Sequence, residues 1–231
     1  MDFFGEGFLD AFRLLLAGDR DTWDPIVLSL WTSISAVAIG GAIGVPFGTW
    51  LGVAKPKGTA VFATLLRAGM GFPTVVVGLL LYGLFRREGP LGPLGWNFTP
   101  QAVVVGQSLL AFPILASLSY GAAAALDPRV METIRTHGGK TGLAVRLAIS
   151  EARPAILGAA LVAFSRVLTE LGVVLVVGGP IKGLTRTMPA LIALETGKGE
   201  FGRAVACGLV LVALACGAGI LAYRPSREAA A

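Results

Sequence analysis

The sequence DPRVMETIRTHGGKTGLAVRLAISEARP, residues 127–154, lies between two long apolar runs and decides how the chain is organised. It is too charged to cross a bilayer, yet its residues follow a pattern. Asp127 can cap a helix, and Pro128 suits the first helical position. Gly138 and Gly139 then end this helix, because glycine relaxes the backbone. A second amphipathic segment follows, so we expect a short helix, a glycine elbow and a second helix lying against one membrane face.

The composition is that of a membrane protein. The chain has 231 residues, of which 55% are hydrophobic and 14% are charged, whereas soluble proteins carry about 25% charged residues. Its 32 glycines are expected where helices pack closely in lipid. The net charge of +5 is modest, and the basic residues lie mainly in loops, which argues against a nucleic-acid-binding protein.

Several apolar segments are long enough to cross a bilayer, which needs about 20 residues. They are residues 25–54, 59–85, 100–126, 154–177 and 204–223. We therefore predict an all-α, polytopic integral membrane protein with five transmembrane helices. The membrane domain covers residues 25–223 and contains the loop 127–153. Arg67 interrupts the second span and can snorkel towards its end.

The two ends of the chain differ from this membrane domain. Residues 1–24 begin with acidic side chains, which argues against a signal peptide. Phe4, Phe8 and Phe12 fall on one side, and this spacing predicts an amphipathic helix lying in the membrane interface. A soluble helix that packs on a partner is the alternative. Residues 224–231 form a polar C-terminal tail.

Arg166 and Glu170 are charged residues inside the fourth span. Arg166 lies about 18 Å along the helix that begins at Pro154, near the middle of the bilayer. A bare charge there is costly, so such residues usually face the bundle interior and are paired, and a spacing of four lets these two pair with each other. Either Arg166 lines the path of an anion, or the pair holds helices together. Lys182 and Arg186, which flank glycine and threonine donors, are further candidates for the translocation path.

The loop between the third and fourth spans resembles a motif of a known family. Glu132, followed six residues later by Gly138, with Pro154 opening the next hydrophobic helix, resembles the EAA loop of importer-type ABC permeases. Thr133 and Ile134 stand where that family has two alanines. The resemblance implies that the short helix docks in a groove of a separate cytoplasmic ABC ATPase and transmits its movement. The residues that it assigns to ATPase coupling are Glu132, Thr133, Ile134, Gly138 and Gly139.

Three more segments, residues 70–85, 89–100 and 165–192, are similar to permeases for molybdate and tungstate. Of these, the glycine- and proline-rich segment 89–100 is most similar to the tungstate permeases. The resemblance implies the permease subunit of an ABC importer for a tetrahedral oxyanion. Tungstate is the favoured cargo, with molybdate and sulfate as alternatives, and an extracytoplasmic oxyanion-binding protein is an implied partner. Because five helices are too few to enclose a path, we predict a homodimer with the path on its two-fold axis.

The orientation in the membrane follows from this resemblance and not from charge. Lys and Arg residues divide almost evenly between the two sides, so the positive-inside rule does not decide between them. The resemblance places the 127–153 loop in the cytoplasm. We therefore expect a multi-pass protein of the cell membrane with its N-terminus outside and its C-terminus in the cytoplasm.

Enzymes and other transporters are the competing classes. Gly139-Lys140-Thr141 matches the end of a P-loop, but Ile134 occupies the position where that motif requires its first glycine. We therefore expect no cofactor in this chain, and we expect ATP and Mg²⁺ to bind the partner ATPase. His137 is the only histidine, which excludes a two-histidine zinc site, and we predict no metal site. Catalytic residues for an intramembrane enzyme are missing. An ATPase-independent secondary transporter or channel would show an internal repeat, and we find no convincing one.

Overall fold

The computed structural model describes residues 3–127, 129 and 141–222. All regular structure in this part of the chain is helical, which confirms the predicted all-α class. The helices follow one another as α1 (Phe3–Leu16), α2 (Arg20–Ala54), α3 (Thr59–Met70), α4 (Thr74–Phe85), η1 (Gly92–Leu94), α5 (Pro100–Ala124), α7 (Thr141–Glu151), α8 (Arg153–Leu168), η2 (Val174–Gly178), α9 (Met188–Lys198) and α10 (Phe201–Ala222).

The membrane spans are of two kinds. The helices α2, α5 and α10 are each long and apolar enough to cross a membrane. The pairs α3 with α4 and α7 with α8 pass the same test together, although they bend by 94° and 74°. The described part of the chain therefore has 3 spans, or up to 5 if each bent pair counts as one.

Two of the predicted spans are not continuous α-helices. In the segment 59–85, α3 ends at Met70 and α4 begins at Thr74. Pro73 explains this break, because proline lacks a backbone N–H and its ring clashes with the preceding turn. The segment 154–177 likewise leaves α8 after Leu168 and continues into the π-helix η2.

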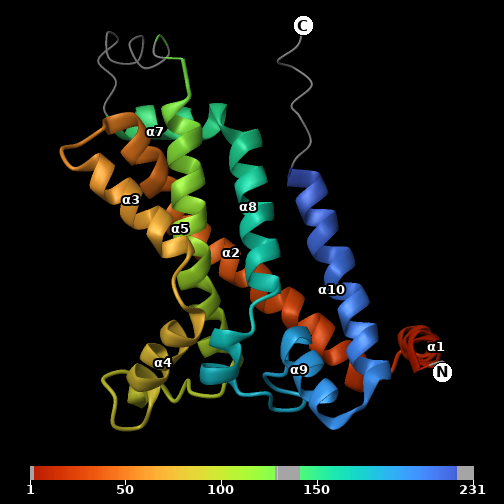
Figure 1. The fold of residues 1–231 in the computed structure, drawn as a ribbon. Coiled ribbons are helices and arrows are strands. Elements are labelled where there is room, and N and C mark those ends of the chain that lie inside the picture. The colour runs from red at the N-terminus through yellow and green to blue at the C-terminus, as the bar shows by residue number, and fades with distance from the viewer. Residues whose placement is uncertain (1–2, 128, 130–140, 223–231) are drawn as a thin grey trace, which may run out of the picture.

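The helices form a bundle with two distinct ends (Figure 1). α7 lies across one end, where α5 and α10 finish and α8 begins, and we call this the loop end. The helix α7 is the second amphipathic segment predicted after the glycine elbow. At the other end, which we call the far end, lie α4, η2 and α9, together with the start of α2.

The helix predicted within residues 1–24 is present as α1. It packs mainly against α10 and lies across the bundle at the far end (Figure 1). Phe8 and Phe12 of its predicted apolar stripe are 44% and 56% exposed. Helix α2 begins at Arg20, ahead of Pro25, so the predicted domain boundary after residue 24 falls inside this helix.

The closest packing joins α2 to α5. Gly40, Gly44, Gly48 and Gly52 recur at every fourth residue of α2, and all four face α5. A Cβ atom at Gly48 would overlap the backbone carbonyl of Ala116. Small residues at this spacing let two helix backbones approach within a membrane, where van der Waals contact drives association.

The largest buried cluster joins α4, α5, α8 and η2. Leu81, Ile114, Val167 and Val173 are among its members, and each is at most 4% exposed. Apolar side chains from four elements therefore pack around the point where α8 ends. This packing holds the break in α8 at one defined place in the bundle.

Candidate functional site

The end of α8 carries a partly buried charge pair. The Nη1 atom of Arg166 lies 2.6 Å from Oε2 of Glu170. The side chain of Glu170 is 3% exposed, whereas that of Arg166 is 41% exposed. The other carboxylate oxygen of Glu170 accepts a hydrogen bond of 3.3 Å from the backbone N–H of Val173. Glu170 therefore neutralises Arg166 and caps the helical turn that follows the break.

Gln107 of α5 stabilises the other side of the same break. Its Nε2 donates a hydrogen bond of 3.1 Å to the carbonyl oxygen of Val167. This carbonyl lies in the last turn of α8 and also accepts a hydrogen bond of 3.1 Å from the backbone N–H of Glu170. Gln107 is buried, so its side chain reaches α8 through the interior of the bundle. The sequence offered a signal for this role, namely an amide inside the apolar run 100–126.

The loop of residues 179–187, between η2 and α9, is held by hydroxyl groups. The hydroxyl of Thr185 donates to the carbonyl oxygens of Gly178 at 2.7 Å and Gly179 at 2.6 Å. The backbone N–H of Met188 donates to Oγ of Ser29 in α2, at 2.7 Å. Both ends of the loop are thereby tied to the bundle, and its basic residues lie at the far end.

The two predicted cations of this loop have different partners. Lys182 Nζ lies 2.7 Å from Oδ2 of Asp21, in the first turn of α2. Arg203 of α10 approaches the same carboxylate at 3.7 Å. Arg186 donates from Nε to the carbonyl oxygen of Pro180, at 3.2 Å. Lys182 is thus compensated by a carboxylate, a partner that sequence reasoning missed.

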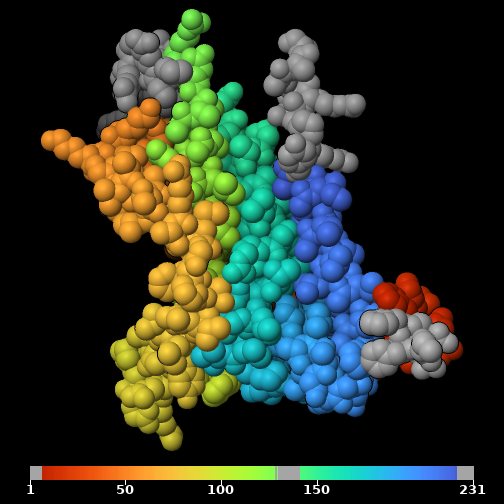
Figure 2. Space-filling view, in the orientation of Figure 1, coloured from red at the N-terminus to blue at the C-terminus, as the bar shows by residue number. Residues whose placement is uncertain are grey.

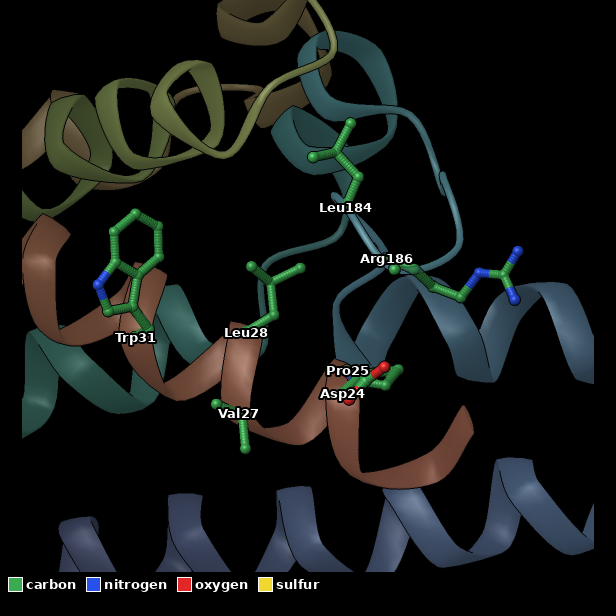
Figure 3. A pocket seen from close by; sticks show the side chains of 8 residues that line it. Asp24, Pro25, Val27, Leu28, Trp31, Leu184 and Arg186 are labelled. Carbon is green, nitrogen blue, oxygen red and sulfur yellow. The ribbon is translucent and has the colours of Figure 1, made fainter. Parts of the chain in front are cut away.

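A pocket of about 390 Å³ lies between this loop and the start of α2. Its walls are Asp24, Pro25, Val27, Leu28, Trp31, Gly183, Leu184 and Arg186. Figure 3 shows that the guanidinium of Arg186 extends away from Trp31 and Leu184. The side chains that enclose the pocket are therefore mostly apolar, and its one arginine does not point its charge into it.

The predicted site residues occupy separate regions. Arg166 and Glu170 lie at the end of α8, whereas Lys182 and Arg186 lie in the far-end loop. The predicted ATPase-coupling residues are outside the described residues; they are Glu132, Thr133, Ile134, Gly138 and Gly139. Within residues 3–127, 129 and 141–222, no three His, Cys, Asp or Glu side chains gather as metal ligands would.

Comparison with known families identifies the class of protein. The family described as the binding-protein-dependent transport system inner membrane component matches residues 44–224. The match runs from the middle of α2 to the end of α10 and includes the loop with the EAA-like pattern. The chain belongs to this family. The permease is accordingly a transport subunit, not a catalytic one.

Curated relatives match the permease over most of its length. It is 36% identical to the probable anion ABC transporter permease protein of Haloferax volcanii, over 85% of this chain and 87% of the relative. It is 32% identical to the tungstate uptake system permease protein TupB of Peptoclostridium acidaminophilum, over 99% and 100%. TupB of Campylobacter jejuni is 33% identical, over 93% and 90%. The predicted resemblance to tungstate permeases is confirmed.

A solved structure supports the fold of the permease. A chain of the MetNI methionine ABC transporter, in an inward-facing conformation, aligns with a TM-score of 0.65. The alignment covers 89% of this chain and 92% of the other chain, at 18% sequence identity. At this identity the likeness concerns the fold alone, and it agrees with an ABC permease.

Proposed function

We propose that the permease forms the membrane path of an importer for tungstate. The observation that carries this proposal is its similarity, from end to end, to a permease of a tungstate uptake system. Molybdate and sulfate are the competing cargoes, because each is a tetrahedral dianion like tungstate. No coenzyme is needed in this chain, since ATP and Mg²⁺ belong to a partner ATPase.

The importer would contain two copies of the permease, two ABC ATPase subunits and an extracytoplasmic binding protein. The ATPase binds at the loop end through Glu132 and the glycine elbow, and the binding protein docks at the far end. The start of α2 and the end of α10 lie at opposite ends of the bundle, so they lie on opposite sides of the membrane, and we assign the start of α2 to the outside. Closure of the ATPase dimer on ATP would switch the path between two open states.

Arg166 would contribute a weak attraction for the anion as it passes. Its positive charge is offset by Glu170 at 2.6 Å, yet its side chain is 41% exposed. An unpaired arginine at this position would hold a dianion more tightly than a paired one and would slow its release. A paired one offers a transient partner, and Lys182 with its partner Asp21 would act in the same way near the outer mouth.

Reconstitution of the complete importer tests this function. The permease, its ATPase and its binding protein are placed in proteoliposomes, and tungstate uptake is measured against equal concentrations of molybdate and sulfate. We expect ATP-dependent uptake with tungstate preferred, and none when the Walker lysine of the ATPase is replaced. Uptake that survives this replacement would instead favour a secondary transporter or channel. A preference for molybdate or sulfate would reassign the cargo.

A further inference from the structure

A second cavity lies nearer the loop end than the pocket beside Arg186. It has a volume of about 760 Å³ and is lined by residues of α3, α5, α8 and α10. Figure 2 shows the side of the molecule on which these four helices reach the surface together. Arg67 contributes the one charged side chain among the described residues of this lining, and Ser117 contributes a hydroxyl. Most of the other lining residues are small, such as Gly121 and Gly158.

The position of Arg67 needs a physical explanation. It lies in the last turn of α3, within the segment 59–85 that is apolar enough to belong to a membrane span. Its side chain is exposed on the surface of a single copy. A charged side chain facing hydrocarbon is costly, and intramembrane arginines therefore face a bundle interior or a water-filled cavity. The cavity beside Arg67 provides such an environment.

The charge of Arg67 is also less compensated than that of Arg166 or Lys182. Arg166 has Glu170 and Lys182 has Asp21 within ion-pair distance. Among the residues that the structure describes, no carboxylate lies within ion-pair distance of Arg67. A dianion entering the cavity would therefore meet an arginine whose charge is available.

The cavity is continuous with the surface of α8 that carries Arg166. Val162 of α8 lines the cavity and is 42% exposed. Arg166 follows it by four residues, so the two side chains lie on the same side of α8, about 6 Å apart along its axis. An anion that leaves Arg166 towards the loop end would reach the space in front of Arg67.

We propose that Arg67 and the cavity in front of it form the inner station for the transported oxyanion, where a hydrated dianion pauses before release at the loop end. The role of Arg67 rests on the proposed transport function. Arg67 acts here as a binding residue, because its positive charge is not offset by a neighbouring carboxylate as that of Arg166 is. The small residues leave room for the anion and its water. Apolar faces such as that of Val212 and Ile220 on α10, which are 61% and 69% exposed, are left to contact lipid.

Gly121 gives a suitable reporter position. It lines the cavity, and a Cβ added there would meet nothing within 4 Å, so Gly121→Cys introduces a thiol without strain. Cys216 is exposed and is replaced by alanine in the test protein, whereas Cys207 is buried and can remain. The assembled importer in proteoliposomes is treated with a negatively charged sulfonate or a positively charged trimethylammonium methanethiosulfonate, and the labelling rate of the new thiol is measured for each.

We expect the sulfonate reagent to react faster, and tungstate to slow its reaction. Arg67→Gln should reduce the ratio of the two rates by about tenfold, because reagents of opposite charge respond in opposite directions to a lost cation. Arg67→Lys should retain the preference. The control, Arg87→Gln, removes an exposed arginine from residues 86–99, between α4 and α5, and should leave the ratio unchanged.

Two results would overturn the role of Arg67. Absence of labelling by both reagents would mean that the cavity is closed to water. A rate ratio that is equal with and without Arg67 would mean that this arginine does not act on anions there. ATP-driven tungstate uptake by the unlabelled Gly121→Cys protein is measured in parallel. If that uptake is absent while the ratio still depends on Arg67, the proposed cargo fails and the anion station stands.

Discussion

Lys182, in the loop before α9, holds the carboxylate of Asp21 in the first turn of α2, with 2.7 Å between Nζ and Oδ2. The two residues lie 161 positions apart in the sequence. Arg203 at the start of α10 approaches the same carboxylate. The far-end loop is thus fastened to the beginnings of two helices, and part of its positive charge is cancelled before any anion arrives.

Releasing Lys182 from this pair should strengthen the attraction for anions at the far end. We expect Asp21→Asn to raise the initial rate of tungstate uptake about twofold at low ionic strength, with the gain lost at high salt because exposed charges are screened. Stability should change little, since an exposed pair contributes about 0–1 kcal/mol. The control is Asp24→Asn, which removes the same charge one turn along α2. Equal effects of both variants would contradict a specific role for the Asp21–Lys182 pair.

The pair of Arg166 and Glu170 can be separated into a structural and a transport contribution. Arg166→Gln leaves the buried carboxylate of Glu170 without its partner, whereas Glu170→Gln leaves an arginine that is 41% exposed, so the first replacement should cost more stability than the second. We therefore expect Arg166→Gln and Glu170→Gln each to lower the thermal unfolding temperature in detergent. The double variant should recover that temperature.

Transport distinguishes the two roles of this pair. If Arg166 attracts the anion, the stable double variant should still import tungstate about tenfold more slowly, as expected when one charge-assisted contact is lost. The measurement is the initial rate of ATP-driven uptake at equal amounts of folded protein. Full recovery of both stability and uptake would show that the pair serves only to hold the break in α8.

The contact between α2 and α5 should not tolerate a side chain at Gly48. A Cβ there overlaps the carbonyl of Ala116, so Gly48→Ala forces the two backbones apart and should destabilise the protein by about 1–3 kcal/mol. Gly121→Ala on α5 is the matched control, because its Cβ meets nothing within 4 Å. That variant should be neutral or slightly stabilising. Thermal unfolding in one detergent compares them, and equal effects would contradict the packing.

Glu132 is expected to couple the permease to its ATPase. Reversing its charge with Glu132→Arg should abolish ATP-driven uptake and the co-purification of the ATPase, while the unfolding temperature stays the same. Glu151→Arg, at the end of α7, is the control, because it reverses an exposed glutamate near the same membrane face. Unchanged uptake with Glu132→Arg would contradict the EAA-like assignment.

The hydropathy pattern predicted the all-α membrane class of the fold, but it did not predict where the spanning helices are interrupted. The apolar segments 25–54 and 100–126 form long helices, although Pro46 and Pro113 lie inside them. The segment 59–85 has the same apolar composition, but Phe72-Pro73 divides it, and a hydropathy average does not register one missing N–H. Proline alone was not a sufficient signal, because α2 and α5 continue through Pro46 and Pro113; at this break Gly71 also ends α3.

The candidate site was predicted in part. The spacing of Arg166 and Glu170 predicted their pairing, since residues four apart share a helix face. Their position at the end of α8 was not predicted, because it depends on the break after Leu168. The partners Asp21 for Lys182 and Gln107 for the end of α8 come from distant parts of the chain, and only the folded structure brings them together.

The close approach of α2 to α5 limits where the protein can change shape. At Gly48 and Gly52 the two backbones are too close to admit a Cβ atom, so neither helix can slide past the other without collision. We expect the pair to move as one rigid body throughout the transport cycle. Bending is then concentrated at the two short breaks that follow Met70 and Leu168. Substitutions at these breaks should alter the speed of the cycle more than the affinity for the anion.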